Sequence, residues 1–273
     1  MAPATGYALR NENRPYADDP AWTAVEIDFL RANHPLRTEP FLTGLDFDYV
    51  SVHTLELSVS GPVGPDSQYL DELLEVATEN GAHSITDHLG FTHAAPGGAG
   101  AGHVMAPPFT LEALDTTCRN IDRIQKHFRG FGFYVENLAH FFEWRDGMPE
   151  VEFMVRMLER TGCGLLLDIT NAYANERNFG GNARDFIRAV LPAANRVQMH
   201  LAGGFFDESR GRYIDSHSEP IPGEVWTLYE EALSLSHTKL DAVFIERDWN
   251  FPSEAGWRNE VHHARSLAEL VAA

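Results

Sequence analysis

Histidine and carboxylate side chains recur at the ends of short apolar runs in this 273-residue sequence. Each run stays hydrophobic until a side chain that could bind a metal closes it, as in YVSVHT, SITDHLGF, FYVEN, LLLDITN, VQMHLAG and VFIERD. A carboxylate is costly to bury at the end of such a run unless it is paired or bound to metal. The pattern therefore predicts a metal site built from His53, His88, Glu136, Asp168, Asn171, His200 and Glu246, joined by Asp215 and His217 of a D-x-H motif.

Each of these residues also has a purely structural interpretation. A single histidine beside a buried strand is more often a hydrogen-bonded structural residue than a ligand. Each carboxylate could pair with an arginine, and Asn171 could cap a helix. The metal interpretation depends on the recurrence of the pattern, not on any one residue.

Ligand chemistry narrows the choice of metal and the number of ions. Mixed imidazole and carboxylate ligands suit iron, manganese or zinc, whereas calcium and magnesium prefer oxygen ligands. Nine donors exceed the needs of one ion, so we expect two or three ions, with Glu136 bridging a pair. Strand order predicts three ligand sets: His53, His88 and Glu136; Asp168, His200 and Glu246; and a third of Asn171, Asp215 and His217. The residues expected to act in catalysis are Glu136, Asp168 and His200.

The elements that would position these side chains alternate between strand-like and helix-like segments. This alternation predicts a parallel sheet covered by helices, and eight strands predict a (β/α)₈ TIM barrel, whose active site lies at the carboxyl ends of the strands. The predicted strands are Gly6–Arg10, Ala24–Asp28, Tyr49–Thr54, Ser84–Gly90, Gly132–Asn137, Gly164–Thr170, Arg196–Ala202 and Ala242–Asp248. The predicted helices are Asp66–Asn80, Thr110–Phe128, Pro149–Arg160, Ala183–Val190, Gly223–Ser236 and Glu254–Ala272. The glycine-rich segment Ala94–Pro108 predicts a mobile loop over the barrel mouth.

Composition limits the class of protein. A length of 273 residues, 44% of them hydrophobic, fits one barrel domain over residues 1–273. The net charge of −19 disfavours binding to nucleic acid. Two cysteines, no apparent signal peptide and no apolar run near the roughly 20 residues that span a bilayer predict a cytoplasmic protein that does not enter the membrane.

Taken as an ordered set, the motifs resemble those of the multinuclear non-haem iron-dependent oxidative enzymes, a family that includes the oxazolone-forming enzyme of methanobactin biosynthesis. The resemblance covers nearly the whole chain, although the opening GYALRNE departs from the family's usual start. The matching segments are YVSVHTLELSVSG, ITDHLGF, YVENLAH, GCGLLLDITNAY, VQMHLAGG, YIDSHSEPI, VWTLYEEAL and VFIERD.

The resemblance implies an O₂-dependent oxidase with two or three iron ions in a mixed-valent Fe(II)/Fe(III) state. Its substrate would be a ribosomally made precursor peptide, modified most often at cysteine, and a small partner protein would recruit that peptide. The nine residues named above match the family's metal-site motifs.

Two other functions remain open at this stage. Similar ligand sets hold divalent metals in sugar isomerases and phosphodiesterases on xylose-isomerase-like barrels, although the net charge disfavours a nucleic-acid substrate. A metal-storing or peptide-binding scaffold is the non-enzymatic alternative.

Overall fold

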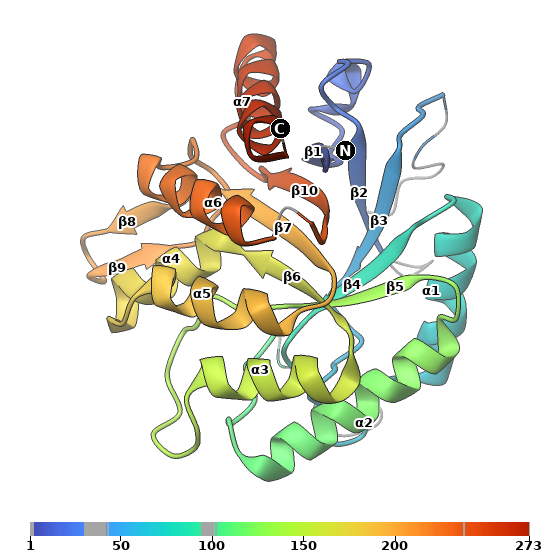
Figure 1. Ribbon diagram of the computed structural model, residues 1–273, viewed down its shortest axis with the longest axis vertical. Helices are drawn as coiled ribbons and strands as arrows, with labels where there is room; N and C mark the ends of the chain where they lie inside the picture. Colours follow the sequence, from blue (N-terminus) through green and yellow to red (C-terminus); the bar gives the residue numbers. More distant parts are fainter. Residues whose placement is uncertain are drawn as a thin grey trace.

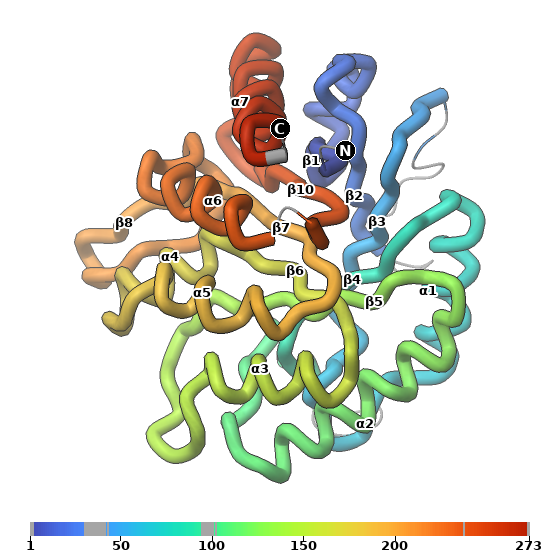
Figure 2. The backbone as a smooth tube through the Cα atoms, viewed as in Figure 1, coloured from blue at the N-terminus to red at the C-terminus, as the bar shows by residue number. Residues whose placement is uncertain are grey.

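Eight parallel strands close into a barrel in the order β1-β10-β7-β6-β5-β4-β3-β2. The structure is a computed structural model that describes residues 3–29, 42, 44–93, 101, 103–236 and 238–272. The colours of Figure 2 follow the sequence around the ring until the last barrel strand meets the first. The predicted (β/α)₈ fold is confirmed. The barrel strands are β1 (Ala4–Ala8), β2 (Ala24–Asp28), β3 (Tyr49–Thr54), β4 (Ser84–His88), β5 (Gly132–Glu136), β6 (Gly164–Asp168), β7 (Val197–Ala202) and β10 (Leu240–Glu246).

Helices surround the barrel, as Figure 1 shows. Several of them begin where the sequence supplies a cap; for example, Asp66 accepts a hydrogen bond from the Gln68 amide, and Thr110 from the Ala113 amide. The helices are α1 (Ser67–Glu79), α2 (Leu111–His127), α3 (Glu150–Thr161), α4 (Ile169–Phe179), α5 (Ala183–Ala193), α6 (Gly223–Ser236) and α7 (Glu254–Ala272), with a short 3₁₀ helix, η1 (Arg14–Tyr16).

Alternation along each strand sends one set of side chains outward to the helices and the other into the barrel. In β6, Leu165 and Leu167 belong to the large core between barrel and helices, whereas Leu166 and Asp168 have the opposite parity. A separate inner cluster fills the barrel near the start of its strands and consists of Ala24, Tyr49, Ala242 and Phe244. The carboxyl end of the barrel interior is left to polar side chains.

Several elements differ from the sequence-based expectation. The strands expected over Gly6–Arg10 and Ala242–Asp248 each lie two residues earlier, as β1 (Ala4–Ala8) and β10 (Leu240–Glu246), which pair with each other. The strand expected over Gly164–Thr170 ends at Asp168, because α4 begins at the next residue. A hairpin of β8 (Phe205–Asp207) and β9 (Arg212–Ile214) follows β7 before α6 begins. The start of α4 and the β8–β9 hairpin were not predicted, because the segments ITNAY and GGFF contain apolar residues that are also compatible with a longer strand.

Other expectations are tested less fully. Within the segment Ala94–Pro108, residues 94–100 and 102 lie outside the described residues, and Met105 forms an isolated bridge with Phe91. Cys118 and Cys163 are buried and unpaired. Among the described helices, none combines the length and the hydrophobicity needed to cross a bilayer.

Candidate metal centre

The strand register brings the predicted ligands together in pairs. His88 of β4 is the partner of Glu136 in β5, and Asp168 of β6 is the partner of His200 in β7. Paired residues of neighbouring parallel strands point to the same face, so each pair shares the barrel interior. The sequence therefore places these side chains side by side as soon as the barrel closes.

The first group is formed by His53, His88 and Glu136. Glu136 Oε2 lies 3.3 Å from His88 Nε2 and 3.8 Å from His53 Nε2. The other ring nitrogen of His53, Nδ1, lies 2.8 Å from the Thr86 hydroxyl, which fixes the ring with Nε2 toward Glu136. One donor atom from each of the three residues lies within 4.8 Å of the others, a spacing that could hold one ion.

The second carboxylate oxygen of Glu136 faces a different group. Its Oε1 lies 3.7 Å from His200 Nδ1, which is also 4.0 Å from Asp168 Oδ2. Glu136, Asp168 and His200 form another set of donors within 4.8 Å. Since Oε1 and Oε2 of Glu136 serve different groups, the geometry suits a bridging carboxylate.

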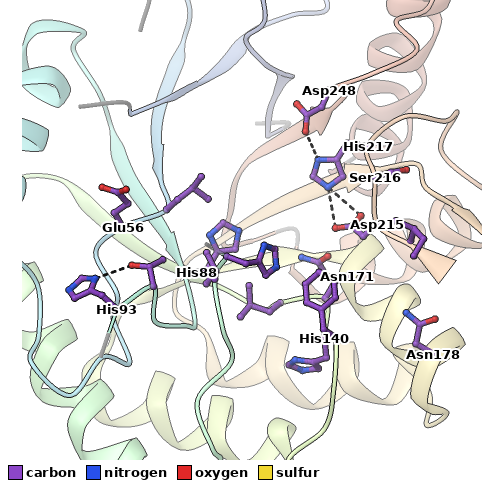
Figure 3. A pocket seen from close by; sticks show the side chains of 18 of the residues that line it. Glu56, His88, His93, His140, Asn171, Asn178, Asp215, Ser216, His217 and Asp248 are labelled. Carbon is purple, nitrogen blue, oxygen red and sulfur yellow. Dashed lines mark hydrogen bonds and ion pairs between the residues drawn. The ribbon is translucent and has the colours of Figure 1, made fainter. Parts of the chain in front are cut away.

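His217 joins Asp168 and Glu246 in a further group of donors. Its Nε2 lies 3.2 Å from Asp215, and its Nδ1 lies 3.0 Å from Asp248, as Figure 3 shows. The backbone of His217 is left-handed, with φ of 50°, a conformation that is uncommon outside glycine and often found at functional sites. The second and third sets expected from strand order are therefore arranged differently. Asp168 and His200 group with Glu136, Glu246 and His200 group with Glu26, and His217 groups with Asp168 and Glu246 instead of Asn171 and Asp215.

Asp168 and Asn171 show how α4 contributes to the site. Asp168 Oδ1 caps the helix by accepting from the Asn171 amide at 2.7 Å, while its Oδ2 faces the interior. Asn171 donates from Nδ2 to the Asn137 carbonyl at 2.9 Å and to Glu136 Oε1 at 3.4 Å. The cap in this helix is Asp168, and Asn171 lies in the first turn with its Oδ1 free to bind.

The segment that carries Asp215 and His217 is held at the end of β7. The amides of Ser218 and Glu219 both donate to the Gly203 carbonyl, at 2.9 and 3.1 Å. A Cβ atom at position 203 would lie 2.0 Å from the Glu219 carbonyl oxygen, so only glycine permits this approach.

We expect Gly203→Ala to lower the free energy of unfolding by about 1–3 kcal/mol, because the backbone at Glu219 must move. The shift would displace His217 and reduce metal binding. Thermal unfolding and metal analysis measure the two effects. Gly223→Ala is the matched control, since a Cβ there meets nothing within 4 Å, and equal behaviour of the two variants would contradict the expectation.

Glu26 is a carboxylate that the sequence reasoning missed. It lies in the middle of β2, is fully buried, and its Oε1 is 3.0 Å from His200 Nε2. Glu26, His200 and Glu246 form a further set of donors within 4.8 Å. The signal was present in the sequence as a carboxylate between Val25 and Ile27 in the segment AVEID, but Glu26 does not close the apolar run and so escaped the pattern.

The two residues that follow Glu246, Arg247 and Asp248, contact different partners. Arg247 pairs with Glu260 at 3.0 Å. Asp248 accepts a hydrogen bond from Arg10 Nε at 2.8 Å and contacts His217. Asp248 therefore links the N-terminal strand to the site.

The donor atoms converge without completing hydrogen bonds among themselves. Among the described residues, buried atoms with no hydrogen-bond partner are concentrated here: both oxygens of Glu26, Glu136 Oε2, Asp168 Oδ2, Asn171 Oδ1, Asp215 Oδ1, His88 Nδ1 and both ring nitrogens of His200. Buried polar atoms are nearly always satisfied, and cations satisfy clustered carboxylates and imidazoles. The residues therefore fit a multi-metal centre.

The electrostatics of the centre also favour added positive charge. Burial, together with the negative charges of Asp215 and Glu136, holds the pKa of Asp168 well above its ordinary value. Burial lowers the pKa of His88 to about 4, so this imidazole is neutral near pH 7 and able to bind a metal. Burial also opposes charge on His200, but Glu246, Glu26 and Glu136 outweigh it and raise the His200 pKa.

A cavity of about 1270 Å³ opens above the centre. Of the candidate ligands, His88, Asn171, Asp215 and His217 line this cavity, and Figure 3 shows them facing it from different elements. Its outer wall includes large hydrophobic side chains that are partly exposed, among them Phe141 at 61% and Trp249 at 68%. The centre is thus reachable by a substrate larger than a single sugar.

Residues 25–269 match the family model of the RiPP precursor modification enzymes MbnB/TglH/ChrH, where RiPP denotes a ribosomally made, modified peptide. The chain belongs to this family. The match confirms the resemblance to the multinuclear non-haem iron-dependent oxidative enzymes. Family membership implies use of a metal and a precursor-peptide substrate.

Curated relatives of this chain include UPF0276 proteins. A UPF0276 protein of Rhizorhabdus wittichii is 37% identical over 221 residues, which covers 80% of this chain and 76% of the relative. A UPF0276 protein of Chromobacterium violaceum is 30% identical over 219 residues, with the same coverage of both chains.

The fold is similar to several solved structures, among them a xylose isomerase-like TIM barrel protein from Mycobacterium smegmatis, with a TM-score of 0.56 at 16% identity, covering 94% of this chain and 92% of its own. A D-psicose 3-epimerase from Clostridium cellulolyticum has a TM-score of 0.59 at 13% identity and covers 100% of this chain and 99% of its own. Endonuclease IV from Thermus thermophilus has a TM-score of 0.57 at 16% identity, covering 98% of this chain and 100% of its own. At these identities the likeness establishes the fold alone.

Proposed function

We propose that this protein is an iron- and O₂-dependent oxidase that modifies a ribosomally made peptide, at a cysteine residue. The observation that carries the proposal is the position of Glu136, whose two oxygens face separate groups of donors below an open cavity. Membership of a RiPP-modifying family supports the peptide substrate.

The ligands proposed for two or three ions are those predicted from the sequence: His53, His88, Glu136, Asp168, Asn171, His200, Asp215, His217 and Glu246. Bound iron would supply a position for the substrate thiolate and the redox chemistry with O₂. The protein would hold the reacting groups close together and exclude bulk water, because the inner ligands are almost fully buried. Glu136, Asp168 and His200 would act closest to the reaction, since they join the groups.

The cavity mouth supports a peptide over a small polar substrate. Small-molecule pockets usually span about 300–1,000 Å³ and enclose most of the ligand, whereas this cavity is larger and opens between exposed hydrophobic side chains. We call these side chains the apolar rim: Leu55, Val63, Phe141 and Trp249. Exposed apolar groups gathered at a site mark surfaces that bind partners.

Co-expression with each short cysteine-containing reading frame that neighbours its gene tests the proposal. We expect one peptide to change mass only when iron and O₂ are present, and an EPR signal of mixed-valent iron to change when that peptide is added. If a partner protein recruits the peptide, its co-expression would increase the yield.

Two outcomes would contradict the proposal. An unchanged peptide mass with full iron loading and the partner present would exclude the oxidase. Turnover of sugars or phosphodiesters with manganese or zinc and no O₂ would instead support a metal-dependent isomerase or phosphodiesterase.

The apolar rim gives a separate prediction about binding. Removing Phe141 and Trp249 together as alanine variants is expected to weaken binding of the modified peptide by about tenfold or more, because exposed aromatic side chains often dominate peptide interfaces. Calorimetry measures the affinity, and the iron content should stay unchanged. Leu270→Ala, at an exposed position on α7 away from the cavity lining, is the control. An equal loss of peptide affinity in this variant would contradict a specific contribution of the apolar rim to binding.

A further inference from the structure

The fully buried carboxylate of Glu26 has no assigned role among the predicted ligands, and its surroundings point to one. Its side chain is 0% exposed and neither carboxylate oxygen has a hydrogen-bond partner among the described residues. Such a group is costly to bury unless a charge or a donor compensates it. A donor faces it: His200 Nε2 lies 3.0 Å from Oε1.

His200 presents its two ring nitrogens to different groups. Nδ1 lies 3.0 Å from Glu246 Oε2 and faces Glu136, whereas Nε2 faces Glu26. A neutral imidazole has one nitrogen that accepts a metal and one that carries hydrogen. The nitrogen that carries hydrogen is set by the acceptor beside it.

We propose that Glu26 is a positioning residue, which accepts the Nε2 hydrogen of His200 and so directs Nδ1 toward the metal. The proposal rests on the metal centre proposed above and adds a residue outside its predicted ligand set. The two atoms lie 3.0 Å apart, within hydrogen-bonding distance. Such a carboxylate–histidine contact fixes the ring and strengthens the histidine as a ligand.

The alternative is that Glu26 is itself a ligand, together with His200 and Glu246. If His200 bound that ion through Nε2, the nitrogen that faces Glu26, while Nδ1 bound another, the ring would have to lose both of its hydrogens. The positioning role requires only the neutral ring. Iron stoichiometry distinguishes the two, because a positioning residue leaves the number of ions unchanged.

The test uses the protein purified from cells grown with ⁵⁷Fe, in the wild type and in Glu26→Gln and Glu26→Met variants. Glutamine keeps an acceptor oxygen, whereas methionine fills similar space without one. We expect both variants to keep the iron content of the wild type. Glu26→Met should release iron about 10–100 times more readily to a chelator and change the Mössbauer spectrum of one iron, and Glu26→Gln should restore most of the loss.

Glu260→Gln provides the control, because Glu260 is a largely buried carboxylate that pairs with Arg247 instead of a predicted ligand. Its chelator release and spectrum should match the wild type. Loss of one iron per chain in both Glu26 variants would overturn the positioning role and make Glu26 a ligand. A wild-type spectrum and release rate in Glu26→Met would also overturn it. Neither readout depends on peptide oxidation, so failure of the oxidase function would be seen separately.

Discussion

Glu136→Gln is expected to remove at least one iron ion per chain and to reduce peptide oxidation by about 100-fold or more. Glutamine keeps the size of the side chain but offers only one good ligand oxygen, so it cannot serve both groups of donors. The expected loss exceeds the 10–100-fold effects of residues that merely support ligands. Metal analysis and a peptide mass assay measure the two losses.

Glu150→Gln is the matched control for this substitution. Glu150 pairs with His140, a residue of the cavity wall, at 2.9 Å. The control tests the loss of a carboxylate near the cavity while leaving the centre intact, and its iron content should equal that of the wild type. Wild-type iron occupancy in Glu136→Gln would exclude Glu136 as the bridge.

Removing the metal is expected to destabilise the fold substantially. Four carboxylates lie close together in the barrel interior: Glu26, Glu136, Asp168 and Glu246. Without bound cations, their negative charge would be offset mainly by nearby histidines such as His200. Ligand binding at a thousandfold excess over Kd stabilises a protein by about 4 kcal/mol. We therefore expect a chelator to lower the free energy of unfolding by about 4 kcal/mol or more.

Thermal unfolding with and without chelator measures this loss, and added iron should reverse it. Glu136→Gln should show a smaller shift upon chelation, because it begins with fewer ions. An unchanged unfolding temperature after complete metal removal would contradict a structural contribution from the centre.

The sequence was sufficient to predict the barrel because its strands are apolar runs with polar ends. Tyr49–Thr54 and Ala24–Asp28 were predicted at their observed bounds. The helix α4 could not be separated from β6, since Asp168 ends the strand and caps the helix at the same residue. The sequence pattern used each polar residue only to mark the end of a strand, so it did not reveal that Asp168 also begins a helix.

The arrangement of the centre was less accessible to sequence reasoning. Strand order placed His53, His88 and Glu136 in one set, and their donor atoms lie within 4.8 Å of one another. It could not show that His217 shares Asp168 and Glu246, because a loop held by Gly203 determines that position. Glu26 was missed because it lies inside its strand, and its contact with His200 joins two strands that are distant in the sequence.

The strand β1 has a consequence for how the protein can be divided. The family match begins at residue 25, yet β1 pairs with both β2 and β10 and closes the ring. Just after β1, Arg10 bonds Asp248, which contacts His217. A fragment cut at the family boundary would expose the edges of β2 and β10 and lose the support of this histidine. The closed barrel therefore requires residues N-terminal to the family match, which begins at residue 25.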